Sequence, residues 1–220
     1  MRAAVVIPAY NEAGGVGGVV QQARELGQVV VVDDASTDDT AEVARRAGAT
    51  VVRHKTKRGY DGALASGFAA ALALDVDAIL TMDADGQHVP ESGRALLDLI
   101  ADDRADVAVG RRPAKARWSE HIFAFYTRRR FGLPDPLCGM KAYRSDVVRV
   151  HRSALDGTTI GAGLTVAALA SGARLAIVPI PIRQRLGTSR FGSGFRANRR
   201  ILAGLCATIL IDLRTRRSRS

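Results

Sequence analysis

The stretch of sequence that decides the fold is Ala78-Ile79-Leu80-Thr81-Met82-Asp83-Ala84-Asp85-Gly86-Gln87-His88. Its first five residues form an apolar run that predicts a buried strand, and this strand stops at two carboxylates one residue apart. In an extended chain residues i and i+2 point to the same side, so we expect Asp83 and Asp85 to converge. Gln87, two residues further on, adds an amide oxygen to the same cluster.

Convergent oxygens of this kind suit a hard divalent cation, Mg²⁺ or Mn²⁺, which in proteins typically also binds substrate phosphates. The alternative interpretation is a polar loop where the strand leaves the sheet, with the aspartates serving as turn residues or helix caps. The Asp-x-Asp pattern alone does not choose between the two. The rest of the chain has to decide.

Short apolar runs alternate with helical segments along the whole chain. Strands are predicted at residues 3–7, 28–32, 49–53, 77–82, 106–109, 138–143 and 174–182. Helices are predicted between most of them, among others at residues 60–74, 90–101, 117–131 and 159–171. This alternation predicts an α/β fold with a mainly parallel central sheet flanked by helices. Pro179 and Pro181 make the last strand an edge strand, because proline cannot donate to a ladder.

Ligands of such sheets bind at the carboxyl ends of the strands. Five loops are therefore expected along one edge: Pro8–Glu12, Asp33–Ser36, His54–Gly59, Asp83–Gln87 and Gly110–Arg112. Their polar, acidic and basic side chains predict a nucleotide cleft with cationic walls. The shared edge favours the metal interpretation of the Asp-x-Asp pair.

The net charge of +10 is concentrated at the C-terminal end of the chain. Residues 183–220 hold ten arginines and one acid, Asp212, whereas residues 1–182 have a net charge of only +1. A basic end of this kind suggests a polyanionic partner: an anionic membrane surface, a phosphorylated substrate or nucleic acid.

Length and composition predict one domain over residues 1–194, followed by a basic amphipathic helix and tail over residues 195–220. The cysteines, Cys138 and Cys206, fit no ligand spacing or disulfide framework, so we expect a reducing compartment. We expect no secretory leader, because Met1-Arg2 runs directly into the first strand.

The last helix contains an apolar run at residues 201–211, which is well short of the ~20 residues that cross a bilayer. With arginines on both sides, this helix is expected either to lie in a membrane interface or to pack on the protein core.

Four stretches of the first half resemble the family 2 glycosyltransferases, which have the GT-A fold. They are Val5-Val6-Ile7-Pro8-Ala9-Tyr10-Asn11-Glu12, Val32-Asp33-Asp34-Ala35-Ser36-Thr37-Asp38, Arg58-Gly59 with Gly62-Ala63, and Met82-Asp83-Ala84-Asp85-Gly86-Gln87-His88. Two later stretches look like the polyprenyl-phosphate sugar synthases, that is, the dolichol-phosphate mannose and glucose synthases. They are Asp135-Pro136-Leu137-Cys138-Gly139-Met140-Lys141-Ala142-Tyr143-Arg144 and Arg185-Leu186-Gly187-Thr188-Ser189-Arg190, with Arg190 where that family usually has lysine.

The resemblance implies a role for each matching residue. Asp83, Asp85 and Gln87 would hold Mg²⁺ or Mn²⁺ on the diphosphate of a GDP- or UDP-hexose donor, with Asp85 also counted as catalytic. Pro8, Tyr10, Glu12, Asp34 and Arg58 would bind the nucleotide. Arg112 would lie near the phosphates or the acceptor, and Arg185, Ser189 and Arg190 would bind the acceptor phosphate. Inversion at the sugar is likewise implied by the family.

The acceptor chemistry depends on whether the nucleophile is a phosphate or a hydroxyl. A phosphate monoester has a second pKa near 6 and is largely ionised at pH 7, so it needs positioning more than a base. Arginines supply bidentate donors for that purpose. A hydroxyl acceptor would require a carboxylate base, for which Asp135 is the candidate; its alternative role is that of a turn residue between prolines.

We therefore predict a metal-dependent, inverting enzyme that moves a hexose from a nucleotide sugar to a polyprenyl phosphate. It would act at the cytoplasmic membrane face, peripheral on the inner side of the plasma membrane. One alternative is a soluble family 2 transferase acting on a sugar or small-molecule hydroxyl. Another is a nucleic-acid-binding module using the basic tail, but that tail has few interleaved aromatics and the module leaves the Asp83/Asp85 pair unexplained, so no nucleic acid is expected.

Overall fold

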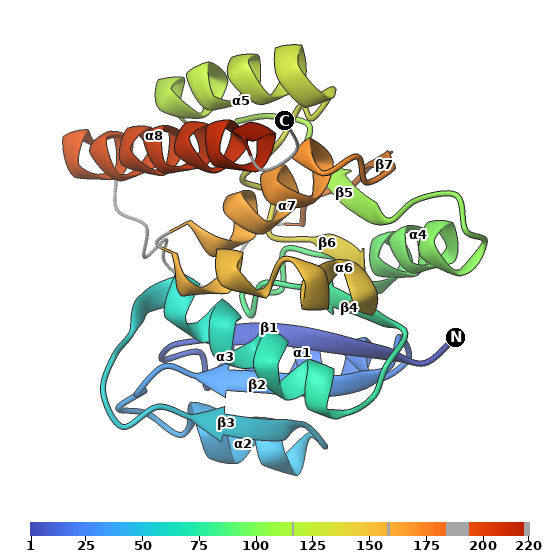
Figure 1. Ribbon diagram of the computed structural model, residues 1–220. Coiled ribbons are helices and arrows are strands. Elements are labelled where there is room, and N and C mark those ends of the chain that lie inside the picture. The colour runs from blue at the N-terminus through green and yellow to red at the C-terminus, as the bar shows by residue number, and fades with distance from the viewer. Residues whose placement is uncertain (116, 158, 184–193, 218–220) are drawn as a thin grey trace.

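The computed structural model of the chain describes residues 1–115, 117–157, 159–183 and 194–217. Its centre is a seven-stranded sheet with the strand order β3-β2-β1-β4-β6-β5-β7 (Figure 1). The strands are β1 (Ala3–Ala9), β2 (Gln28–Asp33), β3 (Thr50–Arg53), β4 (Ala78–Thr81), β5 (Val107–Arg111), β6 (Lys141–Arg144) and β7 (Leu175–Pro179). The order places the predicted edge strand, β7, at the end of the sheet.

The prediction of a mainly parallel sheet is confirmed. Strands β1, β2, β3 and β4 pair in parallel, and so do β5 and β7. Strand β6 is the exception, because it runs antiparallel to both of its neighbours, β4 and β5. It begins at Lys141, three residues later than the sequence predicts.

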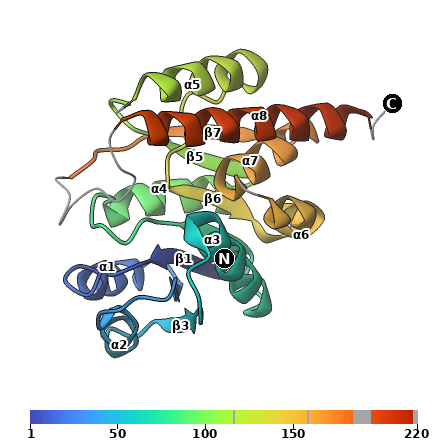
Figure 2. The same cartoon turned by 90° about the vertical axis from the view of Figure 1, so that its left-hand side faces the viewer.

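Helices cover both faces of the sheet. They are α1 (Val16–Ala23), α2 (Thr40–Arg46), α3 (Gly59–Ala73), α4 (Pro90–Ala101), α5 (Trp118–Phe131), α6 (Ser145–Val150), α7 (Ile160–Ala170) and α8 (Phe195–Arg217), with a short 3₁₀ helix, η1, at Arg152–Asp156. Figure 2 shows α1, α2 and α4 on one side of the sheet and α3, α6 and α7 on the other. Helices α5 and α8 lie side by side at the end of the molecule farthest from β3.

The core forms because the central strands β1, β2 and β4 are mostly apolar and buried, and helix α3, which faces them, has small residues. All seven residues of β1 are buried. Helix α3 approaches this strand closely at Gly67, where a Cβ atom would lie 2.2 Å from Cγ1 of Val6. An alanine there would push α3 off the sheet, so the glycine sets the distance between the two layers.

Helix α8 packs on the protein through one face. Its buried Ile201 and Leu205 cluster with Phe123 of α5 and Ala162 of α7. Asp212, fully buried, accepts hydrogen bonds from Tyr126 at 2.8 Å and from Arg130 of α5 at 3.2 and 3.3 Å. One face of α8 therefore belongs to the core, while a separate unit over residues 195–220 stays a prediction.

Candidate functional site

The loops after β1 and β2 lie together at the carboxyl edge of the sheet. The backbone N–H of Asn11 donates to Ser36 Oγ at 2.8 Å, and that of Thr37 donates to Asn11 Oδ1 at 2.8 Å. The N–H of Glu12 donates to Thr40 Oγ1 at 2.7 Å. These bonds hold the predicted nucleotide-binding residue Glu12 against the second loop. Pro8, by contrast, is buried inside β1 opposite Val32.

Asp34 organises the basic loop after β3. Its carboxylate accepts hydrogen bonds from the backbone N–H groups of Arg58 and Gly59, both at 2.7 Å. Nδ1 of His54 lies 2.8 Å from Asp34 Oδ1, and Nε2 of the same ring lies 2.9 Å from Ser66 Oγ. The predicted residues Asp34 and Arg58 are thus brought together, with Asp34 buried beneath the loop and Arg58 exposed on it.

The same loop reaches the predicted nucleotide-binding residue Tyr10. Nζ of Lys57 lies 3.4 Å from the centre of the Tyr10 ring, a cation–π contact between the loops after β3 and β1. Tyr10 is half-buried. The contact places a cation and an aromatic face next to each other at the edge where the sequence predicts a nucleotide.

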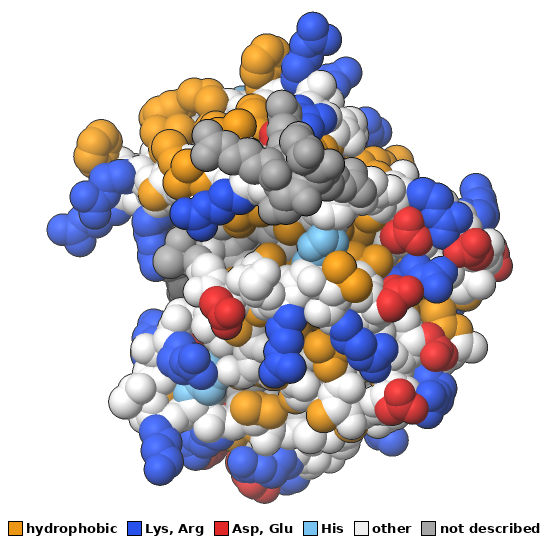
Figure 3. All heavy atoms as spheres, viewed as in Figure 1, with side chains coloured by type: hydrophobic (Ala, Val, Ile, Leu, Met, Phe, Trp, Pro, Cys, Tyr) orange, Lys and Arg blue, Asp and Glu red, His pale blue; other side chains and the backbone are white. Residues whose placement is uncertain are grey.

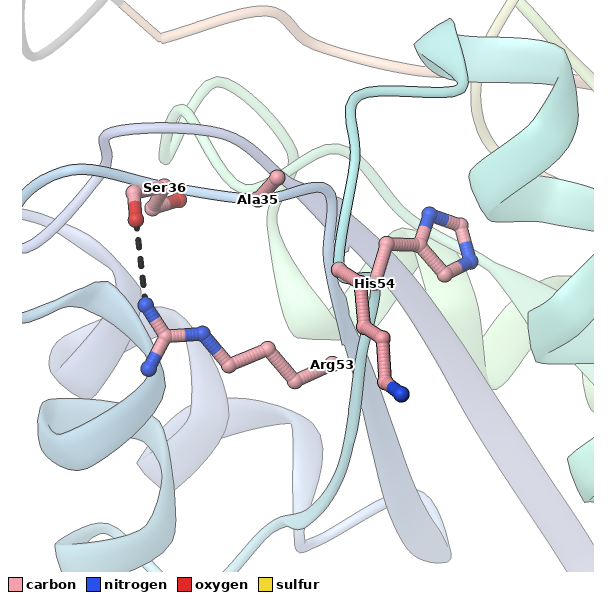
Figure 4. Close-up of a pocket in the computed structure, with 5 residues that line it drawn as sticks. Ala35, Ser36, Arg53 and His54 are labelled. Atoms are coloured by element: carbon pink, nitrogen blue, oxygen red, sulfur yellow. Dashed lines mark hydrogen bonds between the residues drawn. The ribbon is translucent and has the colours of Figure 1, made fainter.

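A hollow of about 430 Å³ opens beside these loops, lined by Ala35, Ser36, Arg53, His54 and Lys55. Figure 4 shows that it lies between the loop after β2 and the end of β3, and that Arg53 reaches across to the backbone oxygen of Ser36. That hydrogen bond measures 3.1 Å. Such a volume is within the range of small-molecule sites.

The Asp-x-Asp stretch follows β4 at the same edge. Asp83 is half-buried and Asp85 is 7% exposed. Asp83 accepts a hydrogen bond from the Tyr60 hydroxyl at 3.0 Å, and Asp85 Oδ1 accepts one from the N–H of Gln87 at 3.1 Å. Tyr60 as a residue is 41% exposed, but desolvation of its hydroxyl against Asp83 and the charge of that carboxylate raise the pKa of Tyr60 above its ordinary value of 10. Tyr60 therefore stays a donor at neutral pH.

The geometric reason for expecting the two carboxylates on one side does not hold. Strand β4 ends at Thr81, and the chain turns at Ala84 and Asp85. Gly86 then adopts a φ of 73°, the left-handed conformation that glycine tolerates best. The alternation of an extended strand therefore stops before Asp85.

Gln87 connects this turn to the segment that precedes the predicted acceptor loop. The N–H of Arg183 donates to the backbone oxygen of Gln87 at 3.0 Å, and Gln87 Nε2 donates to the backbone oxygen of Arg183 at 3.5 Å. The predicted phosphate-binding residues Arg185, Ser189 and Arg190 lie outside the described residues. The chain leading into them is thus held beside Gln87.

Arg112 is bound to carboxylates of its own chain. Its Nε and Nη2 donate to Asp135 at 2.8 Å each, and Nη2 also donates to Glu120 at 3.0 Å. Burial alone would lower the pKa of the guanidinium, but the hydrogen bonds and charge of Asp135, with Glu120, more than offset this and raise it. Asp135 is 1% exposed and has both oxygens on Arg112. These contacts give Asp135 an orienting role and lend no support to its use as a base.

Three residues near Asp83 escaped the sequence analysis as site residues: Tyr60, Gly139 and Lys141. Lys141 is buried on β6, and its ammonium donates to the backbone oxygens of Pro136, at 2.7 Å, and Gly161. Burial lowers the pKa of Lys141 to about 8. For Gly139 and Lys141 the signal was the predicted strand over residues 138–143, but the sequence does not reveal its antiparallel partners, β4 and β5. Tyr60 appeared only as the first residue of a predicted helix.

The acidic turn fits a hard divalent cation by the chemistry of its donors. Asp83, Asp85 and Gln87 offer oxygen ligands, and Mg²⁺ is commonly bound through one or two carboxylates plus substrate phosphates and water. Within the described ranges, no three or more histidine, cysteine or acidic side chains gather in a way that could hold a metal alone. Water and substrate phosphates would supply the remaining ligands.

Comparison with known proteins gives the fold and the family. Residues 4–150 match the family model described as glycosyl transferase family 2. The undecaprenyl-phosphate mannosyltransferase of Micrococcus luteus is 32% identical over 218 residues, covering 88% of this chain and 89% of that protein. The polyprenol monophosphomannose synthase of Mycolicibacterium smegmatis is 32% identical over 221 residues, covering 89% of this chain and 83% of that protein.

A solved structure with the same fold is glucosyl-3-phosphoglycerate synthase from Mycobacterium tuberculosis in complex with Mn²⁺, uridine diphosphate and glucosyl-3-phosphoglycerate. It superposes with a TM-score of 0.74 at 20% identity, covering 94% of this chain and 79% of that one. The likeness confirms the GT-A fold, with its mostly parallel sheet between helices. The match over residues 4–150 and the two relatives at 32% identity identify the chain as a glycosyltransferase that belongs to glycosyl transferase family 2.

Proposed function

We propose that this enzyme is a metal-dependent, inverting glycosyltransferase that moves a hexose from a GDP- or UDP-sugar to a polyprenyl phosphate. One observation carries the proposal: three segments lie together at the carboxyl edge of the sheet. They are the acidic turn after β4, the basic loop at residues 54–59 that Asp34 binds, and the chain at Arg183, which is hydrogen-bonded to Gln87. Donor, metal ligands and the predicted acceptor loop would then meet at one place.

The donor would lie across the loops after β1, β2 and β3. Its nucleoside would use the hollow at Ser36 and His54 or the adjoining Tyr10–Lys57 pair. Asp83, Asp85 and Gln87 would hold Mg²⁺ or Mn²⁺, which when bound supplies positive charge for the departing diphosphate. The related fold solved with Mn²⁺ and uridine diphosphate supports this assignment.

The acceptor would be a phosphate, as the names of both relatives suggest for those proteins. An oxygen of the ionised phosphate attacks the anomeric carbon, and the bond from that carbon to the donor diphosphate breaks. The nucleoside diphosphate leaves with the bonding electron pair. No proton needs to move, which agrees with the engagement of Asp135 by Arg112.

A surface on α5 and α8 supports action on a lipid-linked substrate. Three large apolar side chains of α5, at i, i+4 and i+7 spacing, are exposed: Trp118 by 56%, Ile122 by 45% and Phe125 by 73%. On α8, Phe195, Leu210 and Leu213 are exposed by 83%, 53% and 47%. Figure 3 shows hydrophobic side chains gathered where Figure 1 places these two helices, with Lys and Arg side chains around them.

Arginines complete this surface, which we call the α5–α8 surface. Exposed arginines on the two helices are Arg128, Arg129, Arg130, Arg196, Arg199, Arg200 and Arg214. Apolar side chains with cationic neighbours suit the headgroup region of an anionic bilayer. Among the described helices, none combines the length and the apolar character that a bilayer crossing requires. We propose that the α5–α8 surface rests on an anionic, cytoplasm-facing membrane.

A product-release assay tests the proposed reaction. Purified protein is given a panel of GDP- and UDP-hexoses with Mn²⁺ or Mg²⁺, with and without a short polyprenyl phosphate. We expect release of nucleoside diphosphate that depends on both the metal and the lipid phosphate. Asp85→Asn should abolish turnover, because the variant loses a charged oxygen at the predicted metal site.

Asp98→Asn is the matched control, because Asp98 is exposed on α4, away from the acidic turn. It should keep full activity. Activity retained by Asp85→Asn would remove the metal assignment. Transfer to a sugar hydroxyl in the absence of lipid phosphate would instead support the soluble family 2 alternative.

A further inference from the structure

The carboxylate of Asp83 lies against a glycine of the neighbouring strand segment. In the antiparallel ladder of β4 and β6, Thr81 is opposite Lys141. The ladder ends at this pair, and extending its register by two residues on each chain brings Asp83 opposite Gly139. A Cβ atom on Gly139 would lie 2.2 Å from Asp83 Oδ2 and 2.6 Å from Oδ1. The carboxylate therefore occupies the space that any side chain at position 139 would need.

Gly139 is itself held in place from two sides. Oγ1 of Thr81 donates to the backbone oxygen of Gly139 at 2.7 Å. Lys141 donates to the backbone oxygen of Pro136 at 2.7 Å, so it fixes the other end of the same segment. Gly139, which lies against Asp83, is thus fixed by hydrogen bonds just outside the ends of β4 and β6.

Tyr60 contacts the Asp83 carboxylate through its hydroxyl, on Oδ1, and its position is also fixed. The preceding residue, Gly59, donates its N–H to Asp34 at 2.7 Å. The following residue, Asp61, accepts the N–H of Ile160, at the start of α7, at 2.7 Å. The residues on either side of Tyr60 are therefore hydrogen-bonded to Asp34 and to Ile160. These bonds fix the first turn of α3 and, with it, the direction of the Tyr60 side chain.

We propose, on the basis of the metal-dependent transfer proposed above, that Tyr60 and Gly139 are positioning residues for Asp83. Gly139 gives the carboxylate room, and Tyr60 sets its orientation by a hydrogen bond to one lone pair of Oδ1. An ionised carboxylate has about four lone-pair sites, so the others remain for a divalent cation. The Asp83 carboxylate would then already be oriented before the cation binds.

The strength of such support is known in general terms. Partners that orient a metal ligand without touching the metal typically contribute about 10- to 100-fold in metal affinity. Tyr60→Phe removes only the hydroxyl, so we expect Mn²⁺ affinity to fall by about 10-fold. Gly139→Ala displaces the carboxylate itself and should weaken Mn²⁺ binding by more.

The experiment is a calorimetric titration of Mn²⁺ into the full chain, once in the presence of uridine diphosphate and once with guanosine diphosphate. Wild type, Tyr60→Phe and Gly139→Ala are compared, and thermal unfolding is recorded for each. Tyr126→Phe is the matched tyrosine control, because Tyr126 donates to Asp212 at the contact between α5 and α8. Gly157→Ala is the glycine control, because a Cβ atom there has only an ordinary contact of 3.6 Å.

Weaker Mn²⁺ binding by Tyr60→Phe with unchanged thermal unfolding supports the inference, provided that both controls bind like wild type. If Tyr60→Phe binds Mn²⁺ as tightly as wild type, or more tightly, the positioning role of Tyr60 is overturned. The proposed function is unaffected in that case, because wild type still binds Mn²⁺. Wild-type protein that binds no Mn²⁺ with either nucleotide overturns the inference and the metal-dependent function together. Because Tyr60→Phe keeps the ring, the result does not depend on whether Gly139→Ala folds.

Discussion

Asp135 illustrates how a residue can belong to the site without performing its chemistry. It lies between Pro134 and Pro136, is 1% exposed and holds Arg112 with two hydrogen bonds of 2.8 Å. Removing one partner of a buried ion pair costs several kcal/mol, and Arg112 would keep only its contact with Glu120. Asp135→Asn should therefore lower the free energy of unfolding by roughly 3 kcal/mol, as measured by urea denaturation.

Asp103→Asn is the comparison, since Asp103 pairs with Arg144 and Arg174 at the surface, where such pairs contribute little. It should unfold almost like wild type. If Asp135→Asn instead kept its stability and lost only transfer to a hydroxyl acceptor, Asp135 would be a base after all.

Buried Lys141 makes the free energy of unfolding depend on pH. The folded chain releases the Lys141 proton near pH 8, below the ordinary value of 10.5, because burial disfavours the charge. Between these two values the unfolded chain binds more protons, so the contribution of this group to stability rises with pH across the window. The shift corresponds to roughly 3 kcal/mol.

Lys141→Met removes the titrating group. Urea denaturation of both proteins at each pH gives their free energies of unfolding. Between pH 7.5 and pH 10.5 we expect the free energy of unfolding of wild type to rise by roughly 3 kcal/mol relative to that of Lys141→Met. Parallel curves for the two proteins would show that Lys141 does not titrate in this range.

At the scale of elements, α5 and α8 run side by side and divide their surface between core and exterior. Their inner faces meet at Phe123, Ile201 and the buried Asp212. Deleting residues 195–220 would therefore uncover the core, and substitutions on the exposed α5–α8 surface are the cleaner test. Trp118→Glu with Phe125→Glu puts two negative charges where the proposed bilayer lies.

We expect this double variant to lose most of its binding to vesicles containing phosphatidylserine, measured by co-sedimentation, because it loses apolar contact and gains repulsion. Val150→Glu is the control, since Val150 is 76% exposed on α6, away from that surface. Wild type that fails to sediment with anionic vesicles would contradict the membrane proposal, and equal loss in the control would show a non-specific charge effect.

The elements were largely predictable because their signals are local. Apolar runs that end at glycines or carboxylates predicted strands alternating with helices. This alternation predicted the mainly parallel sheet. The turn after β4 was predicted only as the alternative to convergent carboxylates, because the left-handed conformation of Gly86 cannot be read from the pattern of an extended strand. Contacts such as Arg112 with Asp135 depend on two segments that meet only in the fold.

At the scale of the whole molecule, the pairing of Asp83 with Gly139 shows the same limit. The two residues are far apart in the sequence, and they meet only because β6 runs antiparallel to β4 just beyond them. The resemblance to family 2 glycosyltransferases located the acidic turn, but not the glycine beneath it. The direction of one strand was the missing information.

Strand β6 has a consequence for how the protein assembles. In the strand order, β3-β2-β1-β4 and β5-β7 meet only through it, although it is synthesised after β5. In a nascent chain that ends before residue 138, one edge of β4 has no strand to pair with. Strand β5 is then unpaired on both sides, because β6 and β7 have not yet been synthesised. The seven-stranded sheet can therefore be completed only after β6 (Lys141–Arg144) has been synthesised and has inserted between β4 and β5. Gly139, which lies against Asp83, is synthesised just before β6.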